Sequence, residues 1–202
     1  MKTALILILS MLAVGCTDTT KEDLQSFLQN GVSLEGGTWK TSCLIIDGTY
    51  QRYTASFTGS TYSETTTVYS DLCVTPQMEI RESGTFSVAG SPNTYATIDR
   101  SVTALNMTAR TATMAQSFNS VSYCGVSSWT AGSAVDLINK TCDGQTMPSM
   151  GQYYYDIYFI ESLAGNNPGA LHFGNRGGVN DGLTPAKRPT SFLVQPAYYK
   201  QY

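Results

Sequence analysis

Residues 37–48 have the sequence GTWKTSCLIIDG, and residues 49–58 continue as TYQRYTASFT. The pair Asp47-Gly48 favours a tight hairpin turn, because both residues tolerate the positive φ that such a turn requires. In the second segment, apolar residues such as Tyr53 and Phe57 alternate with polar ones, which is the two-residue period of a strand with one buried face. The stretch therefore predicts two antiparallel strands joined by a hairpin.

Most of the remaining chain has the same character. Short segments rich in Thr, Val, Ile, Tyr and Phe alternate with turn residues such as Gly, Asn, Ser and Pro. Residues 110–150 are less regular, and there we expect loop with one strand, plus one or two helical turns over 134–139. Eight or nine short strands with tight turns predict an all-β domain, for which an antiparallel up-and-down β-barrel is favoured over a β-sandwich. The further strands are expected over 61–70, 78–88, 95–98, 101–109, 153–160, 170–173 and 190–201.

Composition supports a sheet protein and excludes some partners. Charged residues make up 13% of the 202 residues, below the usual value of about 25%, and 13 tyrosines with many Ser and Thr take their place. Such hydroxylated and aromatic side chains suit a half-exposed sheet. A formal net charge of −3 gives no reason to expect nucleic acid as a partner.

The N-terminal residues have the features of an export signal. Lys2 precedes an apolar run over residues 4–14, which is too short to span a bilayer, and small residues then lead to Cys16. The run Ala13-Val14-Gly15-Cys16 resembles the lipobox of a bacterial lipoprotein. The resemblance implies that residues 1–15 are a signal peptide and that Cys16 is acylated and anchors the chain in a membrane. Because Thr17 and not Asp follows Cys16, it also implies the outer membrane.

Two further regions follow from this interpretation. Residues 16–35 are expected to form a tether with a short helix, since Thr20 can cap it and Leu24, Phe27 and Leu28 share one face. Residues 36–202 are expected to form the barrel domain, whose size of roughly 170 residues suits a single domain.

One motif points to a family. Gly37-Thr38-Trp39 resembles the Gly-x-Trp motif at the start of the first strand in lipocalins and other calycins. The resemblance implies that Trp39 closes one end of an eight-stranded barrel, and that an arginine, for which Arg188 is the candidate, packs across its ring. A calycin-like barrel would bind a small apolar or amphipathic ligand. Its cavity is expected to be lined by Tyr53, Phe57, Met78, Leu105 and Ile157.

An alternative is a barrel filled by its own side chains, since a barrel of about eight strands can be either filled or hollow. The protein would then be a structural or interaction lipoprotein of the cell envelope, with a protein partner that the sequence does not identify.

The cysteines other than Cys16 are even in number, and in an exported chain they predict disulfides. Four cysteines allow three pairings, among which the sequence does not decide. We expect Cys43–Cys73 and Cys124–Cys142, because each pair joins elements that are close in sequence. A zinc site is disfavoured, since no Cys-x-x-Cys occurs.

Catalytic patterns are scarce. The single histidine, His172, has only Glu161 as a recognisable acidic partner, and a partly exposed strand histidine is the favoured interpretation. Glu79 and Glu82 are three apart and point to opposite faces of a strand. A carboxylate pair between strands is conceivable, but nothing in the sequence marks one. We therefore expect a protein that is not an enzyme and holds no metal or cofactor.

Overall fold

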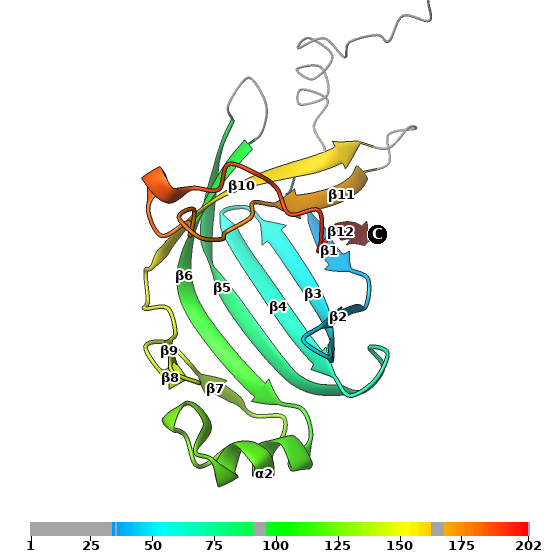
Figure 1. Ribbon diagram of the computed structural model, residues 1–202, viewed down its shortest axis with the longest axis vertical. Helices are drawn as coiled ribbons and strands as arrows, with labels where there is room; N and C mark the ends of the chain where they lie inside the picture. The colour runs from blue at the N-terminus through cyan, green and yellow to red at the C-terminus, as the bar shows by residue number, and fades with distance from the viewer. Residues whose placement is uncertain (1–33, 35, 91–95, 163–167, 202) are drawn as a thin grey trace, which may run out of the picture.

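The structure is a computed structural model that describes residues 34, 36–90, 96–162 and 168–201. Among these residues, eight antiparallel strands close a barrel in the order β1, β12, β11, β10, β6, β5, β4, β3 and back to β1 (Figure 1). The prediction of an up-and-down β-barrel is thus confirmed, against the alternative of a sandwich. The strands are β1 (Gly37–Thr41), β3 (Thr49–Thr58), β4 (Thr61–Tyr69), β5 (Pro76–Gly90), β6 (Ala96–Ala109), β10 (Tyr153–Ser162), β11 (Pro168–Phe173) and β12 (Tyr198–Gln201).

The predicted first hairpin is present, with one interruption. Asp47 and Gly48 have φ values of 48° and 75°, as the tight turn requires. The expected strand over 37–46 is split into β1 and β2 (Leu44–Ile46), and both pair with β3. The break falls at Cys43, which forms a disulfide with Cys73 in the turn between β4 and β5. The expected helix over residues 20–28 lies outside the described residues.

Strand β6 has two different neighbours along one edge. Its first half pairs with β10, and its second half pairs with β7 (Ala134–Asp136). Residues 110–152 therefore form an insert that leaves the ring after β6 and returns before β10 (Figure 1). The insert contains α2 (Ala112–Ser120), the 3-10 helix η1 (Tyr123–Gly125), β8 (Thr141–Cys142) and β9 (Gln145–Thr146).

The insert differs from the prediction for residues 110–150. A helix lies at 112–120 and not near 134–139, where the chain instead forms β7. The helix begins because the Thr111 hydroxyl accepts a hydrogen bond from the Met114 amide, a side-chain cap. Met114, Ala115 and Phe118 then fall at helical spacing and pack against the barrel.

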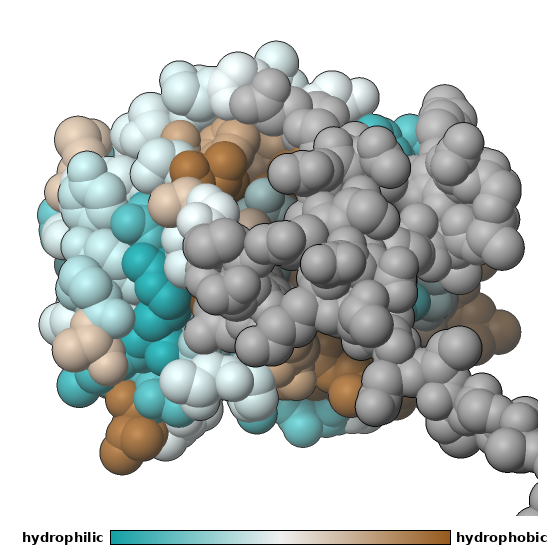
Figure 2. Space-filling model, turned by 90° about the horizontal axis from the view of Figure 1, so that it is seen from above, coloured by the Kyte–Doolittle hydropathy of each residue, from teal (hydrophilic) through white to brown (hydrophobic). Residues whose placement is uncertain are grey.

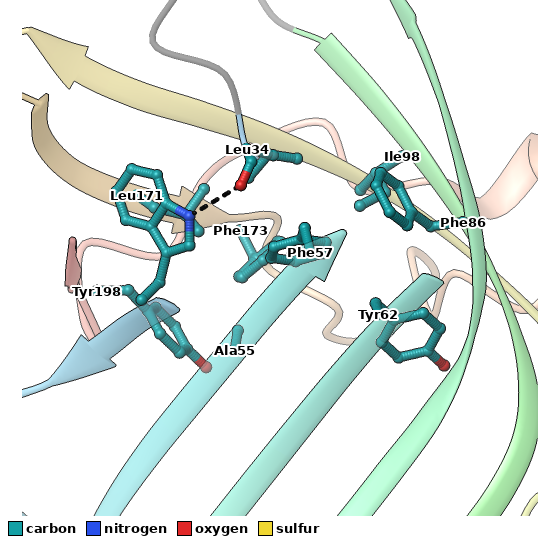
Figure 3. Close-up of a cluster of buried hydrophobic side chains, with 10 residues drawn as sticks. Leu34, Ala55, Phe57, Tyr62, Phe86, Ile98, Leu171, Phe173 and Tyr198 are labelled. Carbon is teal, nitrogen blue, oxygen red and sulfur yellow. Dashed lines mark hydrogen bonds between the residues drawn. The ribbon is translucent and has the colours of Figure 1, made fainter. Parts of the chain in front are cut away.

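The buried side chains form two groups. We call them the upper core and the lower core, because the first includes residues of β11, towards the top of Figure 1, and the second includes residues of the insert, at the bottom. The upper core lies inside the closed ring and is rich in aromatic rings (Figure 3). The lower core lies between the inner face of the sheet and the insert. The upper core comprises Leu34, Trp39, Ala55, Phe57, Tyr62, Phe86, Ile98, Leu171, Phe173 and Tyr198. The lower core comprises Leu105, Met107, Ala109, Ala115, Cys124, Trp129, Leu137 and Cys142.

Both expected disulfides are present. Cys43–Cys73 joins the break after β1 to the β4–β5 turn, and Cys124–Cys142 joins η1 to β8 within the insert. The insert thus carries its own covalent link.

The chain between β11 and β12 crosses the barrel as an irregular segment, which we call the C-terminal crossing (residues 174–197), with one 3-10 helix, η2 (Pro185–Lys187). The predicted strand over 190–201 is therefore present only at Tyr198–Gln201. Pro189 and Pro196 lack the amide hydrogen that strand pairing needs, which explains the shorter strand. Seen from above, hydrophobic residues of the described surface form separate small patches among hydrophilic ones (Figure 2).

Candidate ligand-binding site

A cluster of ionised side chains lies inside the barrel. Arg100 on β6 is 1% exposed and Asp156 on β10 is fully buried. The Arg100 guanidinium donates a hydrogen bond to Glu64 on β4, and its Nη2 lies 3.6 Å from Asp156 Oδ2. The rings of Tyr62 and Phe173 each lie 5.5 Å from the guanidinium carbon. Such cation–π contacts lower the cost of burying the guanidinium.

Asp156 fixes the start of the C-terminal crossing. Its Oδ1 accepts hydrogen bonds from the amides of Ile157 and Gly174, at 2.8 and 3.0 Å. A side chain at Gly174 would meet Asp156 Oδ1 at 2.5 Å, so the close approach needs glycine. The crossing then places Arg176, whose Nε lies 3.0 Å from Asp156 Oδ2. Burial raises the pKa of Asp156 above its ordinary value, while Arg176 and Arg100 act in the opposite direction.

Glu64 and Glu82 are directly opposite each other on β4 and β5, with both side chains on the inner face. The Tyr62 hydroxyl donates a hydrogen bond of 2.8 Å to Glu82 Oε1. Burial raises the pKa of Glu82, and the neighbouring charge of Glu64 raises it further. The carboxylate pair between strands, which the sequence did not mark, is therefore present.

A cavity of about 230 Å³ opens beside this cluster. One part of its wall is polar, with Glu64, Asn175 and Arg176, and the other part is largely apolar, with Phe173, Leu193, Pro196 and Tyr198. The side chain of Arg176 is 32% exposed and lies over the Tyr154 ring, with its guanidinium carbon 5.4 Å from the ring centroid. The cavity therefore presents charged and apolar surface to the same occupant.

The five residues expected to line a ligand cavity do not line a common one. Phe57 belongs to the upper core and Tyr53 packs against it, while Leu105 belongs to the lower core and Met78 packs against that. Ile157 is buried on the other face of β10 from its neighbour Asp156, because adjacent strand residues point to opposite sides.

The expected stacking of Arg188 on Trp39 is also corrected. Trp39 is fully buried and its Nε1 donates to the Leu34 carbonyl at 3.3 Å, but the cation over its ring is Lys200, with Nζ 5.7 Å from the centroid. The register explains the difference, because Lys200 on β12 is the direct partner of Trp39 on β1. Arg188 instead pairs with Asp99 and lies over Tyr155.

His172 and Glu161 do meet, with Nε2 3.2 Å from Oε1, while Nδ1 of His172 lies 3.0 Å from the Leu193 carbonyl. The described residues place no Ser or Cys nucleophile in hydrogen-bonding contact with this pair. In the described part of the chain, no group of three or more His, Cys, Asp or Glu could hold a metal ion. No described helix is both long enough and apolar enough to cross a membrane.

No family model matches the chain, and a search of curated proteins finds no significant match.

Proposed function

We propose that this protein binds a small amphipathic molecule in the cavity beside Arg100 and Asp156, without catalysing a reaction. The observation that supports it is the composition of the cavity wall, in which Glu64 and Arg176 face the same space as Phe173 and Leu193. Ligand sites commonly combine an apolar lining with a few convergent polar groups, and this wall has that composition.

The size of the cavity limits the ligand. Sites for drug-sized molecules usually measure about 300–1,000 Å³, and this cavity of about 230 Å³ is smaller. The occupant is therefore a compact molecule, or one end of a longer molecule whose remainder stays outside. It does not extend through the upper core, where Phe57 and Phe86 pack edge to face with centroids 5.2 Å apart.

The packed upper core also favours a second candidate function. A barrel half filled by its own rings suits a structural or interaction protein of the cell envelope, which would contact a protein partner through its outer surface.

Whether a ligand is bound can be tested by native mass spectrometry of the protein, purified from its own envelope in mild detergent. We expect a retained small-molecule mass, and we expect Leu193→Trp to remove it by filling the cavity. Val194→Trp is the matched control, because Val194 is the adjacent residue and is 80% exposed. A chain without any added mass, or equal retention in both variants, would favour the interaction protein.

We further propose that a lipid on Cys16 holds the protein in a membrane, in the outer membrane of a Gram-negative cell. The support is the lipobox-like run Ala13-Val14-Gly15-Cys16. Metabolic labelling with an alkyne analogue of palmitate should label the protein, and Cys16→Ser should abolish the label. Fractionation of the two membranes then tests the location. An unlabelled wild-type chain would contradict the anchor.

A further inference from the structure

One carboxylate oxygen of a cavity residue has no hydrogen-bond partner in the described part of the chain. Glu64 lines the cavity and its side chain is 27% exposed. Arg100 bonds to Oε1 of Glu64, whereas Oε2 makes no hydrogen bond with another described residue. A charged acceptor is thus available to an occupant of the cavity.

A second polar group that lines the cavity with Glu64 also has no hydrogen-bond partner among the described residues. Tyr198 lines the cavity and is 9% exposed, and its hydroxyl makes no hydrogen bond with any other residue that the structure describes. The ring itself is held edge to face against Phe173, with centroids 5.6 Å apart. Burial, and then the charge of Glu64, raise the pKa of Tyr198, so the group stays a neutral hydroxyl. Because Tyr198 lines the cavity, its hydroxyl is available to hydrogen-bond with an occupant.

The guanidinium groups around the cavity are already paired with carboxylates. Three carboxylates, of Glu64, Glu82 and Asp156, face two guanidinium groups among the described residues. Both guanidinium groups are already engaged, because Arg100 bonds to Glu64 and Arg176 pairs with Asp156. Among the residues that the structure describes, Glu82 has only the Tyr62 hydroxyl as a hydrogen-bond partner. An anion bound here would compete with Glu64 and Asp156 for these two guanidinium groups, whereas a cation would meet the free carboxylate oxygen of Glu64.

We propose that the ligand carries a cationic amine, which binds between Glu64 Oε2 and the Tyr198 hydroxyl. Its apolar part then packs on Phe173, Leu193 and Pro196, which line the same cavity. This inference rests on the proposed binding function and specifies the chemical class of the ligand.

Three probes with the same eight-carbon chain separate the possible charges of the ligand. Octylammonium, octanol and octanoate are titrated into the full protein, with binding followed by isothermal titration calorimetry. A hydrogen bond to a charged group contributes enough for roughly tenfold in affinity, so we expect octylammonium to bind about tenfold more tightly than octanol, and octanoate more weakly still. If octanoate bound most tightly, the polar end of the ligand would lie at Arg176 and the proposal would be wrong.

Two substitutions locate the amine. Glu64→Gln should weaken octylammonium binding roughly tenfold, and Tyr198→Phe roughly fivefold, through loss of a charged and a neutral hydrogen bond. Tyr198→Phe leaves the Arg100 cluster intact, so it keeps the test informative if Glu64→Gln unfolds the chain. Glu79→Gln is the control, because Glu79 pairs with Arg110 on the outer face. Unchanged affinity in Tyr198→Phe and in a folded Glu64→Gln would overturn the site.

Leu193→Trp separates this inference from the proposed function. If the wild type bound all three probes equally and Leu193→Trp bound none of them, the proposed binding function would stand and the amine would be rejected. Failure of all three probes to bind would reject the amine too. The proposed function itself falls only when native mass spectrometry also shows no retained mass, or equal retention in Leu193→Trp and Val194→Trp.

Discussion

The upper and lower cores of the barrel are built from different side chains. The upper core is mainly aromatic, contains no methionine, and surrounds the buried Arg100 and Asp156. The lower core is closed by the insert and brings together Met78, Met107, Met114 and Met147, four of the seven methionines in the chain. Strand pairing closes the upper half, whereas the lower half is covered by the insert, which pairs with β6 through β7 and is crosslinked internally by its own disulfide.

The comparison shows two ways in which one sheet can fill its interior. Aromatic rings and paired charges have few alternative arrangements, so the upper core is specific in its packing. Methionine is flexible and fills irregular gaps, so the lower core is expected to tolerate change. The two tryptophans report on the two halves separately, since Trp39 lies in the upper core and Trp129 in the lower.

The largest effect is expected from removing the central cation. Arg100→Met leaves Glu64 and Asp156 without their shared partner, and breaking a buried ion pair typically costs about 3–5 kcal/mol. Urea unfolding should show a loss of this size in the free energy of unfolding. Arg110→Met is the control, because the Arg110–Glu79 pair is partly exposed and should contribute less than about 1 kcal/mol. Equal losses in the two variants would show that the buried cluster contributes nothing special.

Loss of the insert's disulfide comes next. Cys124 and Cys142 are 18 residues apart, and a loop of about 15 residues corresponds to about 3 kcal/mol of stabilisation. The double change Cys124→Ser and Cys142→Ser should lower stability by about that amount, with the loss concentrated in the lower core.

The two tryptophans give the measurement for this variant. In a Trp39→Phe background the fluorescence reports Trp129, and in a Trp129→Phe background it reports Trp39. We expect the Trp129 transition to shift to lower urea by more than the Trp39 transition. Identical shifts would mean that the two cores unfold as one unit.

Matched substitutions compare the packing of the two cores directly. Phe57→Leu should cost about 1–2 kcal/mol, because it leaves a void among fixed rings. Met107→Leu conserves volume in the lower core and should cost less than about 1.5 kcal/mol, and less than Phe57→Leu. Chemical denaturation of both variants gives the comparison, and the reverse order would contradict the view that the lower core is the adaptable one.

The smallest effect is expected from pH. The groups that act on Glu82 are Glu64, Arg100, Arg176 and Tyr62, and its pKa is raised chiefly by burial. The folded protein therefore holds a proton more tightly than the unfolded chain, so stability should fall as pH rises from about 4 through the raised pKa of Glu82. Glu82→Gln should flatten this part of the stability profile, whereas Glu79→Gln should not. A profile that instead rises with pH in the wild type and is unchanged in Glu82→Gln would be inconsistent with a buried acid.

Much of the fold follows from local sequence. The alternation of apolar and polar residues marks the strands, and Asp47-Gly48 marks the first hairpin, because both depend on neighbours close in the chain. The short sequence separation within each cysteine pair led to the correct disulfides.

The ion cluster was not predictable in this way. The strands predicted over 95–98 and 101–109 leave out Asp99 and Arg100, yet β6 runs through both residues without interruption. Asp99 points outward to Arg188, and Arg100 points inward to Glu64 and Asp156. The partners are distant in sequence, so only closure of the barrel shows that both charges are paired. One clue was present, an acid at position 156 within the most aromatic stretch of the chain.

Closure of the ring sets an order of events during synthesis. The barrel closes where β1 pairs with β12, with Thr38 opposite Gln201. The first strand therefore has no partner on this side until the last strand has been synthesised. A nascent chain that already contains β1 to β11 still has one free edge on β1 and another on β11, and such edges readily pair with other chains. Long-range closure of this kind is slow compared with local hairpin formation. The free edges of β1 and β11 therefore stay exposed to aggregation until the four residues of β12 have paired with both strands.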